Sequence, residues 1–483
     1  MKAPNRVALI AVLTLSVVAS PAVASPPNVS PPVANTIGAP GAGDPFFPLA
    51  GNGGINVSNY NLDLAYDPTA RRLQGTAKLQ ILATQNLSRF DLDLRGFQVG
   101  TITVNGTPAS WTRDGQELMI TPSNLIRKGT AFTVIVPYSG APQTVIDPDG
   151  TSEGWVYTDD GAVVVGEPQG SPGWYPVNDT PRDKATYTVK MTVPQGLTAV
   201  GNGSLLGQST SGGRTTFTWR EGYPMASYLT TITLGRFDVS TSTTASGIPI
   251  YVAVDPSLAS SVSSTLRKLP AMVSFLEDLY GPYPFESVGA IVDNAPELGY
   301  SLETQTKPVF DTAPDEVTLL HELSHMWYGD AVTLRTWPDI WLHEGFATWS
   351  EWIWTERQGG KTAAQRFKEL ANTPAKDSAF WNPPPGDPGT AANLFDGTIY
   401  DRGAMTLEAL RERIGDAQFF TVMRRWYAGH RYGNVSTPEF IALAEKVSGQ
   451  DLDAFFDTWL YEPNKPAGLT GGTAAVTATT QRR

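Results

Sequence analysis

The stretch "HELSHMWYGDAVTLRTWPDIWLHEGFATWSEW", from His321 to Trp352, decides how this sequence is interpreted. It contains three of the four histidines in the whole chain. Two of them, His321 and His325, stand four residues apart, and a helix brings such a pair to one face, one turn apart. The spacing therefore predicts a helix that presents two imidazoles to a single metal ion.

Two imidazoles are too few for a catalytic zinc ion, which usually takes three protein ligands and keeps a fourth position open. Glu344 follows His325 after eighteen intervening residues, on a second predicted helix that runs back alongside the first. The sequence therefore predicts one zinc ion bound by His321, His325 and Glu344, in an open catalytic site rather than a closed structural one. A lone H-E-x-x-H match can be an accidental helix face; here the scarcity of histidine and the second helix favour zinc.

Glu322 lies inside the H-E-x-x-H motif, where a carboxylate can hold a water molecule beside the metal. Zinc-bound water is acidic enough to attack at neutral pH. Glu322 is therefore the predicted general base, which would then pass the proton to a leaving amine.

Two further polar residues lie close to the predicted ligands. His343 adjoins Glu344 but faces another side of the helix, so we interpret it as an outer or surface residue and not as a ligand. Glu351, two turns after Glu344, could orient a ligand histidine. An ordinary charged position on the helix is the simpler interpretation of Glu351.

The N-terminus has the pattern of a secretory signal peptide over residues 1–24. Lys2 and Arg6 form a basic start, "VALIAVLTLSVVA" forms an apolar core, and Ala22-Val23-Ala24 is a cleavage site. The apolar run is short for a membrane span. We therefore expect an exported protein with no membrane span after cleavage.

Composition excludes several other classes of protein. The net charge is -12 and there is no run of Lys or Arg, which argues against nucleic acid or an anionic membrane as the main partner. The absence of cysteine excludes disulfides, thiolate metal sites and a cysteine nucleophile.

The pattern along the chain predicts an α+β protein with two domains. Residues 25–54 are rich in Pro and Gly and predict a flexible lead-in. Short alternating segments over 55–245 predict an all-β domain, a curved sheet or a sandwich. Helical periodicity dominates 246–463, the predicted catalytic domain, and residues 464–483 form a predicted disordered tail.

Several segments together resemble the aminopeptidase N family of gluzincin metallopeptidases. They are "HELSHMWYGD", "WPDIWLHEGFA", "LYGPYPF", "GEPQGSPGWYPVNDTPRDKATYTVKMTVP" and "IYDRGAMTLEAL". The resemblance extends from about residue 45 to 463. It implies a thermolysin-like catalytic domain and substrates that are peptides with a free N-terminus.

The resemblance also implies roles for three residues that spacing alone does not single out. Tyr400 in "IYDRG" matches a tyrosine that donates to the oxyanion. Glu303 in "YSLETQTKPVF" matches the glutamate that binds the substrate's α-amine, and Gln169 in "GEPQG" matches the β-domain residue that helps to hold the same amine. An enzyme that binds the substrate's α-amine in this way, with an amine clamp, would be an exopeptidase. A blocked or internal amide brings no cation to pair with the carboxylate.

The chain departs from the family pattern at several points. Residues 300–304 keep only the Glu of the G-A-M-E-N motif, His343 replaces the usual Asn, and Met326 replaces the commoner Gln. The family's long C-terminal helical domain is not seen, so we expect a more open cleft, or closure by an oligomer or by the β domain.

The sequence thus favours a secreted zinc aminopeptidase. A zinc endopeptidase would share the zinc chemistry but not the amine clamp, and a metal-stabilised binding module would need neither Glu322 nor Tyr400.

Overall fold

The computed structural model describes Met1, residues 36–373 and 379–466, and Leu469. Apart from Met1, the predicted signal peptide lies outside these residues, as do residues 25–35 of the predicted lead-in and nearly all of the predicted tail. Among the described residues, no helix is both long and apolar enough to cross a bilayer.

The described part of the predicted lead-in is held by hydrogen bonds. The backbone N–H of Gly38 donates to the carbonyl of Arg89 over 2.9 Å. The buried carboxylate of Asp44 accepts from the N–H of Phe47 at 3.1 Å and from the N–H of Trp337 at 2.8 Å. Residues 36–54 are therefore not a free linker, because they join the β domain to the segment that precedes helix α4 (Trp341–Arg357).

The largest sheet of the β domain has nine strands, and its long strands alternate buried and exposed residues as a half-buried sheet requires. Strands β1 and β2 pair antiparallel, and β1 pairs parallel with β13. In sheet order the path is β15 (Ser204–Ser211), β16 (Arg214–Met225), β13 (Ala185–Pro194), β1 (Ile55–Asp67), β2 (Arg72–Ala83), β9 (Ala131–Gly140), β5 (Thr103–Val104) and β6 (Thr107–Pro108), and β4 (Gln98–Val99) also pairs with β9.

Two smaller sheets complete the β domain. One has three strands, in the order β3 (Phe90–Asp93), β8 (Glu117–Thr121) and β7 (Ser110–Asp114). The other has five, in the order β10 (Thr144–Ile146), β11 (Ser152–Tyr157), β12 (Ala162–Val165), β17 (Ile232–Gly235) and β14 (Thr198–Gly201). The five-stranded sheet matters for the site, because Asp149 lies in the β10–β11 loop and Glu167 follows β12.

A further five-stranded sheet leads into the helical part of the chain. Its order is β18 (Asp238–Thr243), β19 (Pro249–Val254), β20 (Val288–Val292), β22 (Val309–Phe310) and β21 (Ser301–Leu302). Helices α1 (Ala259–Leu266) and α2 (Leu269–Tyr280) connect β19 to β20. Because β18 and β19 pair across residue 245, the two predicted domains meet within a sheet, and the boundary itself stays a prediction.

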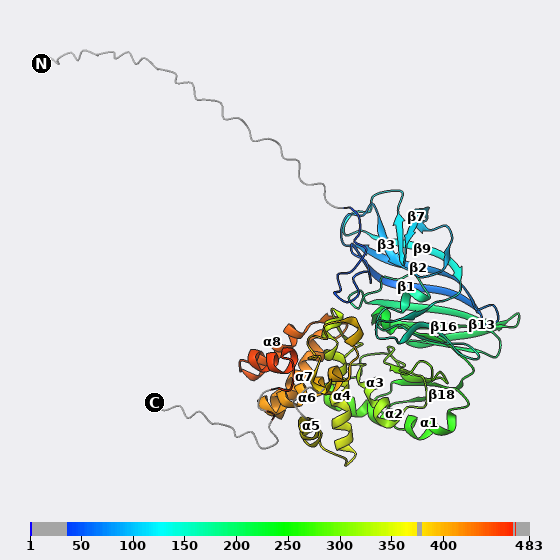
Figure 1. Cartoon of the computed structure of the whole chain (residues 1–483). Coiled ribbons are helices and arrows are strands. Elements are labelled where there is room, and N and C mark those ends of the chain that lie inside the picture. Colours follow the sequence, from blue (N-terminus) through cyan, green and yellow to red (C-terminus); the bar gives the residue numbers. More distant parts are fainter. Residues whose placement is uncertain (2–35, 374–378, 467–468, 470–483) are drawn as a thin grey trace, which may run out of the picture. The chain divides into compact units, whose positions relative to one another are not determined.

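The remaining chain is mostly helical (Figure 1). The helices are α3 (Glu316–Ser324), α4 (Trp341–Arg357), α5 (Ala363–Ala371), α6 (Gly397–Ile414), α7 (Asp416–His430), α8 (Thr437–Ser448) and α9 (Asp453–Phe456). Strand β23 (Val332–Leu334) pairs with β24 (Gly433–Val435) and ties the α3–α4 connection to the end of α7.

Helices α4 and α6 approach each other at two glycines. A Cβ atom added to Gly345 would lie 2.8 Å from the backbone carbonyl carbon of Gly403, which is too close for any real side chain. The two helices can therefore pack this closely only with glycine at both positions.

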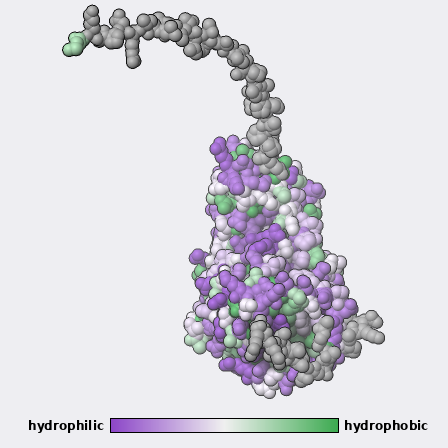
Figure 2. All heavy atoms as spheres, turned by 90° about the vertical axis from the view of Figure 1, so that its left-hand side faces the viewer, coloured by the Kyte–Doolittle hydropathy of each residue, from purple (hydrophilic) through white to green (hydrophobic). Residues whose placement is uncertain are grey.

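One apolar core runs through both parts, from Phe47 to Leu460. The face in Figure 2 is mostly hydrophilic, with only small apolar patches. The predicted α+β class, a β domain followed by a mostly helical domain, is confirmed.

Candidate active site

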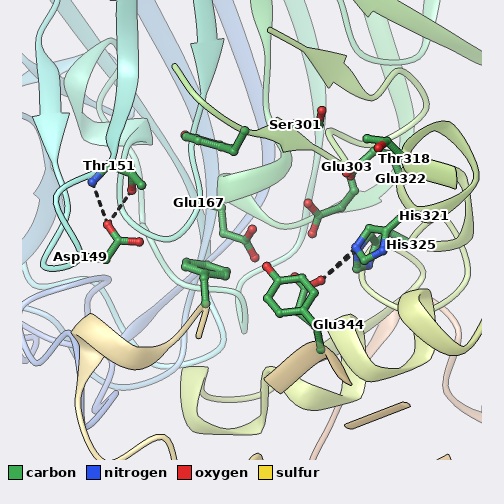
Figure 3. A pocket seen from close by; sticks show the side chains of 13 residues that line it. Asp149, Thr151, Glu167, Ser301, Glu303, Thr318, His321, Glu322, His325 and Glu344 are labelled. Carbon is green, nitrogen blue, oxygen red and sulfur yellow. Dashed lines mark hydrogen bonds and ion pairs between the residues drawn. The ribbon is translucent and has the colours of Figure 1, made fainter. Parts of the chain in front are cut away.

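Three predicted ligands converge where α3 meets α4. His321 lies in the last turn of α3, His325 is its C-terminal cap residue, and Glu344 lies in the first turn of α4. The Nε2 atoms of His321 and His325 lie 3.1 Å and 3.4 Å from Oε2 of Glu344. Figure 3 shows the two imidazoles facing the Glu344 carboxylate.

The outer nitrogens of both imidazoles have partners. Nδ1 of His321 lies 2.6 Å from Oε1 of Glu351, and Nδ1 of His325 donates to the carbonyl of Tyr328 at 3.1 Å. These bonds leave each Nε2 free to bind a metal, as such contacts do in zinc sites. The simpler interpretation of Glu351, an ordinary charged helix position, is therefore wrong.

The donor set and its spacing fit a catalytic zinc ion. Two imidazole nitrogens and one carboxylate oxygen are a common set for such an ion. Donors at ordinary zinc distances in a tetrahedron lie about 3.4 Å apart. The observed separations agree with that spacing, and all three donors are within 4.8 Å of one another.

Glu322 is buried beside the triad. Burial raises the pKa of its carboxyl from the ordinary value of 4.5 to about 7, against the opposing effect of His321 and His325. A carboxylate with a pKa near neutrality is suited to take up and release a proton at the operating pH.

Tyr400 reaches the triad from α6. Its ring centroid lies 6.0 Å from that of His321, and the two planes are inclined by 26°. Burial raises the pKa of the phenol well above 10, and the carboxylate of Glu344 adds to the rise. The hydroxyl therefore stays protonated and can act as a hydrogen-bond donor.

Two buried carboxylates face the same space. Glu303 follows β21 and is 2% exposed, and Glu167 follows β12 and is 7% exposed. One oxygen of each, Oε1, has no hydrogen-bond partner among the described residues. Burial raises the pKa of both groups, and the neighbouring carboxylate of Glu303 raises that of Glu167 further. Such a pair is stabilised by a cation placed between the carboxylates.

Gln169, the predicted amine-binding residue of the β domain, does not line this space. Its side-chain N–H donates to Oδ1 of Asp147 at 2.9 Å, and its carbonyl accepts from Arg95 at 3.0 Å. The two partners engage both the N–H and the carbonyl of the amide. Glu167, two residues earlier in the same segment, lines the cavity instead, and the amine-binding role of Gln169 stays a prediction.

His343 is fully buried, so the expectation that it lies on the surface is wrong. The alternative, that it lies outside the set of metal ligands, stays a prediction. Its Nε2 accepts the backbone N–H of Leu334 at 2.8 Å. Burial lowers the pKa of the imidazole to about 3, so the ring is neutral and its proton is on Nδ1. A donor atom of His343 lies within 4.8 Å of carboxylate oxygens of Glu167 and Glu303.

The triad, Glu322, Tyr400 and the two carboxylates Glu303 and Glu167 line one cavity of about 250 Å³. Its lining residues are Asp149, Thr151, Glu167, Tyr300, Ser301, Glu303, Thr318, His321, Glu322, His325, Glu344, Phe395 and Tyr400. Sequence reasoning missed Asp149, Glu167 and Phe395 as site residues. The only local signal for Glu167 was its place beside Gln169, and "DPDG" around Asp149 indicates no more than a turn.

Comparisons with known proteins agree with this geometry. Residues 56–229 match the family described as the peptidase M1 N-terminal domain, and residues 285–459 match the peptidase family M1 domain. The rice aminopeptidase M1-D is 27% identical over 319 residues, which are 60% of this chain and 36% of that protein. The bovine glutamyl aminopeptidase is 26% identical over 329 residues, which are 62% of this chain and 34% of that protein. The chain thus spans about a third of the length of these relatives.

Solved structures match over almost their whole length. The M1 zinc metallopeptidase of Deinococcus radiodurans is 30% identical, with a TM-score of 0.80, and the match covers 88% of this chain and 98% of that one. A mutant of that enzyme, 29% identical to this chain with a TM-score of 0.80, was solved bound to a Tyr-Ser-Ala substrate, with 88% and 99% of the chains covered. With both parts of the chain matched and the zinc-binding triad in place, this chain belongs to peptidase family M1, the zinc metallopeptidases that the aminopeptidase N-like resemblance predicted.

Proposed function

We propose that this chain is a secreted zinc aminopeptidase, which removes single residues from the free N-terminus of peptides. The observation that carries the proposal is the buried carboxylate pair of Glu303 and Glu167 in the same cavity as the zinc-binding triad. Relatives named as aminopeptidases support it, as does the Tyr-Ser-Ala complex of the Deinococcus radiodurans relative.

The carboxylate pair would bind the α-ammonium group of the substrate. An ammonium group has three donors, and Oε1 of Glu303 and Oε1 of Glu167 both lack a donor among the described residues. Burying an unpaired charge is costly, so an acetylated or internal amide would leave the pair uncompensated. This difference would restrict cleavage to the first peptide bond.

The remaining groups would serve the reaction itself. When bound by His321, His325 and Glu344, zinc lowers the pKa of water and polarises a carbonyl group. Glu322 would accept the proton of the attacking water and deliver it to the leaving amine. The Tyr400 hydroxyl would donate to the oxygen that becomes negatively charged.

Export is the second part of the proposal. Its support is the basic start, the apolar core and the Ala-Val-Ala site within residues 1–24. Fractionation of cells that express the whole chain, with N-terminal sequencing of the product, tests it. A mature protein outside the cytoplasm that begins near Ser25 is expected, and an uncleaved intracellular product would contradict export.

The activity is tested with amino-acid anilides, each offered free and N-acetylated, before and after treatment with a chelator. We expect cleavage of the free forms only, loss of activity with the chelator, and recovery with zinc. Cleavage of the acetylated forms would indicate an endopeptidase, and cleavage of none would favour a binding module.

A further inference from the structure

One carboxylate of the cavity has no part in zinc binding, proton transfer or amine binding. Asp149 lines the same cavity as the triad, in the β10–β11 loop. Figure 3 shows Asp149 and Thr151 on the side of Glu167 that is remote from His321 and His325. The cavity therefore extends past the proposed amine-binding carboxylates to a further acidic group.

Asp149 is exposed, and one oxygen of its carboxylate is held by hydrogen bonds within the β10–β11 loop. Its Oδ1 accepts both the backbone N–H of Thr151 at 2.8 Å and the Thr151 hydroxyl at 2.7 Å. No ion pair joins Asp149 to a Lys or Arg of the described residues. A carboxylate that is oriented but not neutralised can bind a cation from outside the protein.

Two aromatic residues line the same cavity as Asp149. Tyr300 and Phe395 both line the cavity, and the Tyr300 hydroxyl donates to the carbonyl of Ser152 at 2.9 Å. Burial raises the pKa of Tyr300, and several carboxylates, Glu167 and Asp149 among them, add to the rise. The Tyr300 hydroxyl thus bonds to the residue that follows Thr151, whose hydroxyl and N–H bind the Asp149 carboxylate. Aromatic faces suit the stem and the planar head of an arginine side chain.

We propose that Asp149 binds the positively charged side chain of the substrate's first residue, so that the enzyme prefers peptides that begin with arginine. This inference rests on the proposed aminopeptidase function, because the amine held by Glu167 and Glu303 directs the first side chain into the remaining space. None of the thirteen described lining residues is Lys or Arg, so the cavity has no such cation to pair with an acidic first residue.

Citrulline tests the charge without changing the shape, since it is an uncharged counterpart of arginine of almost equal size. We would measure kcat/KM for arginine, citrulline and leucine anilides with the zinc-loaded enzyme. We expect arginine to exceed citrulline by up to about fivefold, as an ion pair with an exposed carboxylate allows, and the ratio to fall with added salt. A ratio near one would overturn the inference.

Asp149→Asn is the matching variant, because Asn keeps an oxygen that can accept from Thr151. It should bring the arginine-to-citrulline ratio close to one, mainly through KM for arginine, while leucine hydrolysis and zinc content stay unchanged. Asp159→Asn, which alters an exposed acid that does not line the cavity, should change none of these values.

Two outcomes separate this inference from the proposed function. An unchanged ratio in Asp149→Asn, with leucine still released, would overturn the role of Asp149 alone. A lack of cleavage of every free-amine substrate by the zinc-loaded enzyme would overturn the aminopeptidase function and this inference with it.

Discussion

Oε1 of Glu351 lies 2.6 Å from Nδ1 of His321, although the two residues belong to different helices. Helix α4 therefore supplies one metal ligand, Glu344, and two turns later the partner that orients a second ligand on α3. The relative position of α3 and α4 thus sets both the distance and the orientation of the donors.

Replacing Glu351 with glutamine should weaken zinc binding, because a neutral amide holds the imidazole less firmly than a carboxylate does. Loss of such a partner typically costs about 10–100-fold in metal affinity. Competition with a chelator of known affinity measures it. Glu297→Gln, at an exposed position outside the cavity, is the control. Equal affinities of the two variants would show that Glu351 does not support the ligand.

Glu322→Gln should keep zinc and lose turnover. The amide cannot accept the proton of water, and loss of a general base costs on the order of 10²–10⁴ in rate. Metal content by elemental analysis and kcat on a free anilide are the two measurements. Full activity with full zinc content would remove Glu322 from the proposed mechanism.

Tyr400→Phe should lower kcat with little change in KM, because the hydroxyl would donate only to charge that develops during the reaction. Loss of one such donor costs roughly 10²–10³ in kcat. Tyr432→Phe serves as the control, since the Tyr432 hydroxyl donates to the carbonyl of Pro284 and does not line the cavity. A change confined to KM would reassign Tyr400 to substrate binding.

Glu167→Gln and Gln169→Ala should differ in kind. The first removes a carboxyl group from the proposed amine site and should raise KM for free-amine substrates. The second leaves the buried Asp147 and the half-buried Arg95 without their amide partner, and should lower stability by about 1–3 kcal/mol with KM unchanged. Steady-state kinetics and thermal unfolding separate the two effects. The reverse pattern would return the amine-binding role to Gln169.

Stability should fall as the pH rises from 5 to 8 because of acids in the β domain. Glu117 and Asp93 face each other across β8 and β3. Burial, with repulsion from Asp93, raises the pKa of Glu117 from 4.5 to about 9. The folded chain then binds the proton more tightly than the unfolded chain, so this contribution is complete below about pH 4.5 and is lost toward pH 9. Melting temperatures across this range should decline, with a smaller slope in Glu117→Gln. Parallel slopes would exclude Glu117 as a source.

The parts of the site that sequence predicts are those set by local periodicity. His321 and His325 lie on one helix, so their spacing alone fixes their common face. Glu351 is also set by helical spacing, but spacing cannot tell whether a charged residue faces solvent or another helix. The β-domain side of the site depends on loop conformation, and two residues in one loop can point in opposite directions. Gln169 and Glu167 are an example of this, and Asp149 is another residue whose place depends on a loop.

The alternation of buried and exposed residues predicts the β domain, because this alternation is also a property of neighbouring residues in the sequence. It does not predict how strands pair over long distances, such as the parallel pairing of β1 with β13. It also does not predict that Asp44, in a segment rich in Pro and Gly, binds the backbone of Trp337. Such contacts form only once the whole chain is folded.

The contact of Gly345 with Gly403 lies close to both sides of the reaction centre. Gly345 follows the metal ligand Glu344, and Gly403 lies three residues after Tyr400. The contact between the two backbones therefore sets the distance between the metal site and the Tyr400 phenol. No side chain lies in this contact that could rotate and compensate for a change in the distance. An alanine at either position would leave every reactive group present and yet wrongly spaced, so both glycines carry functional information although neither takes part in a chemical step.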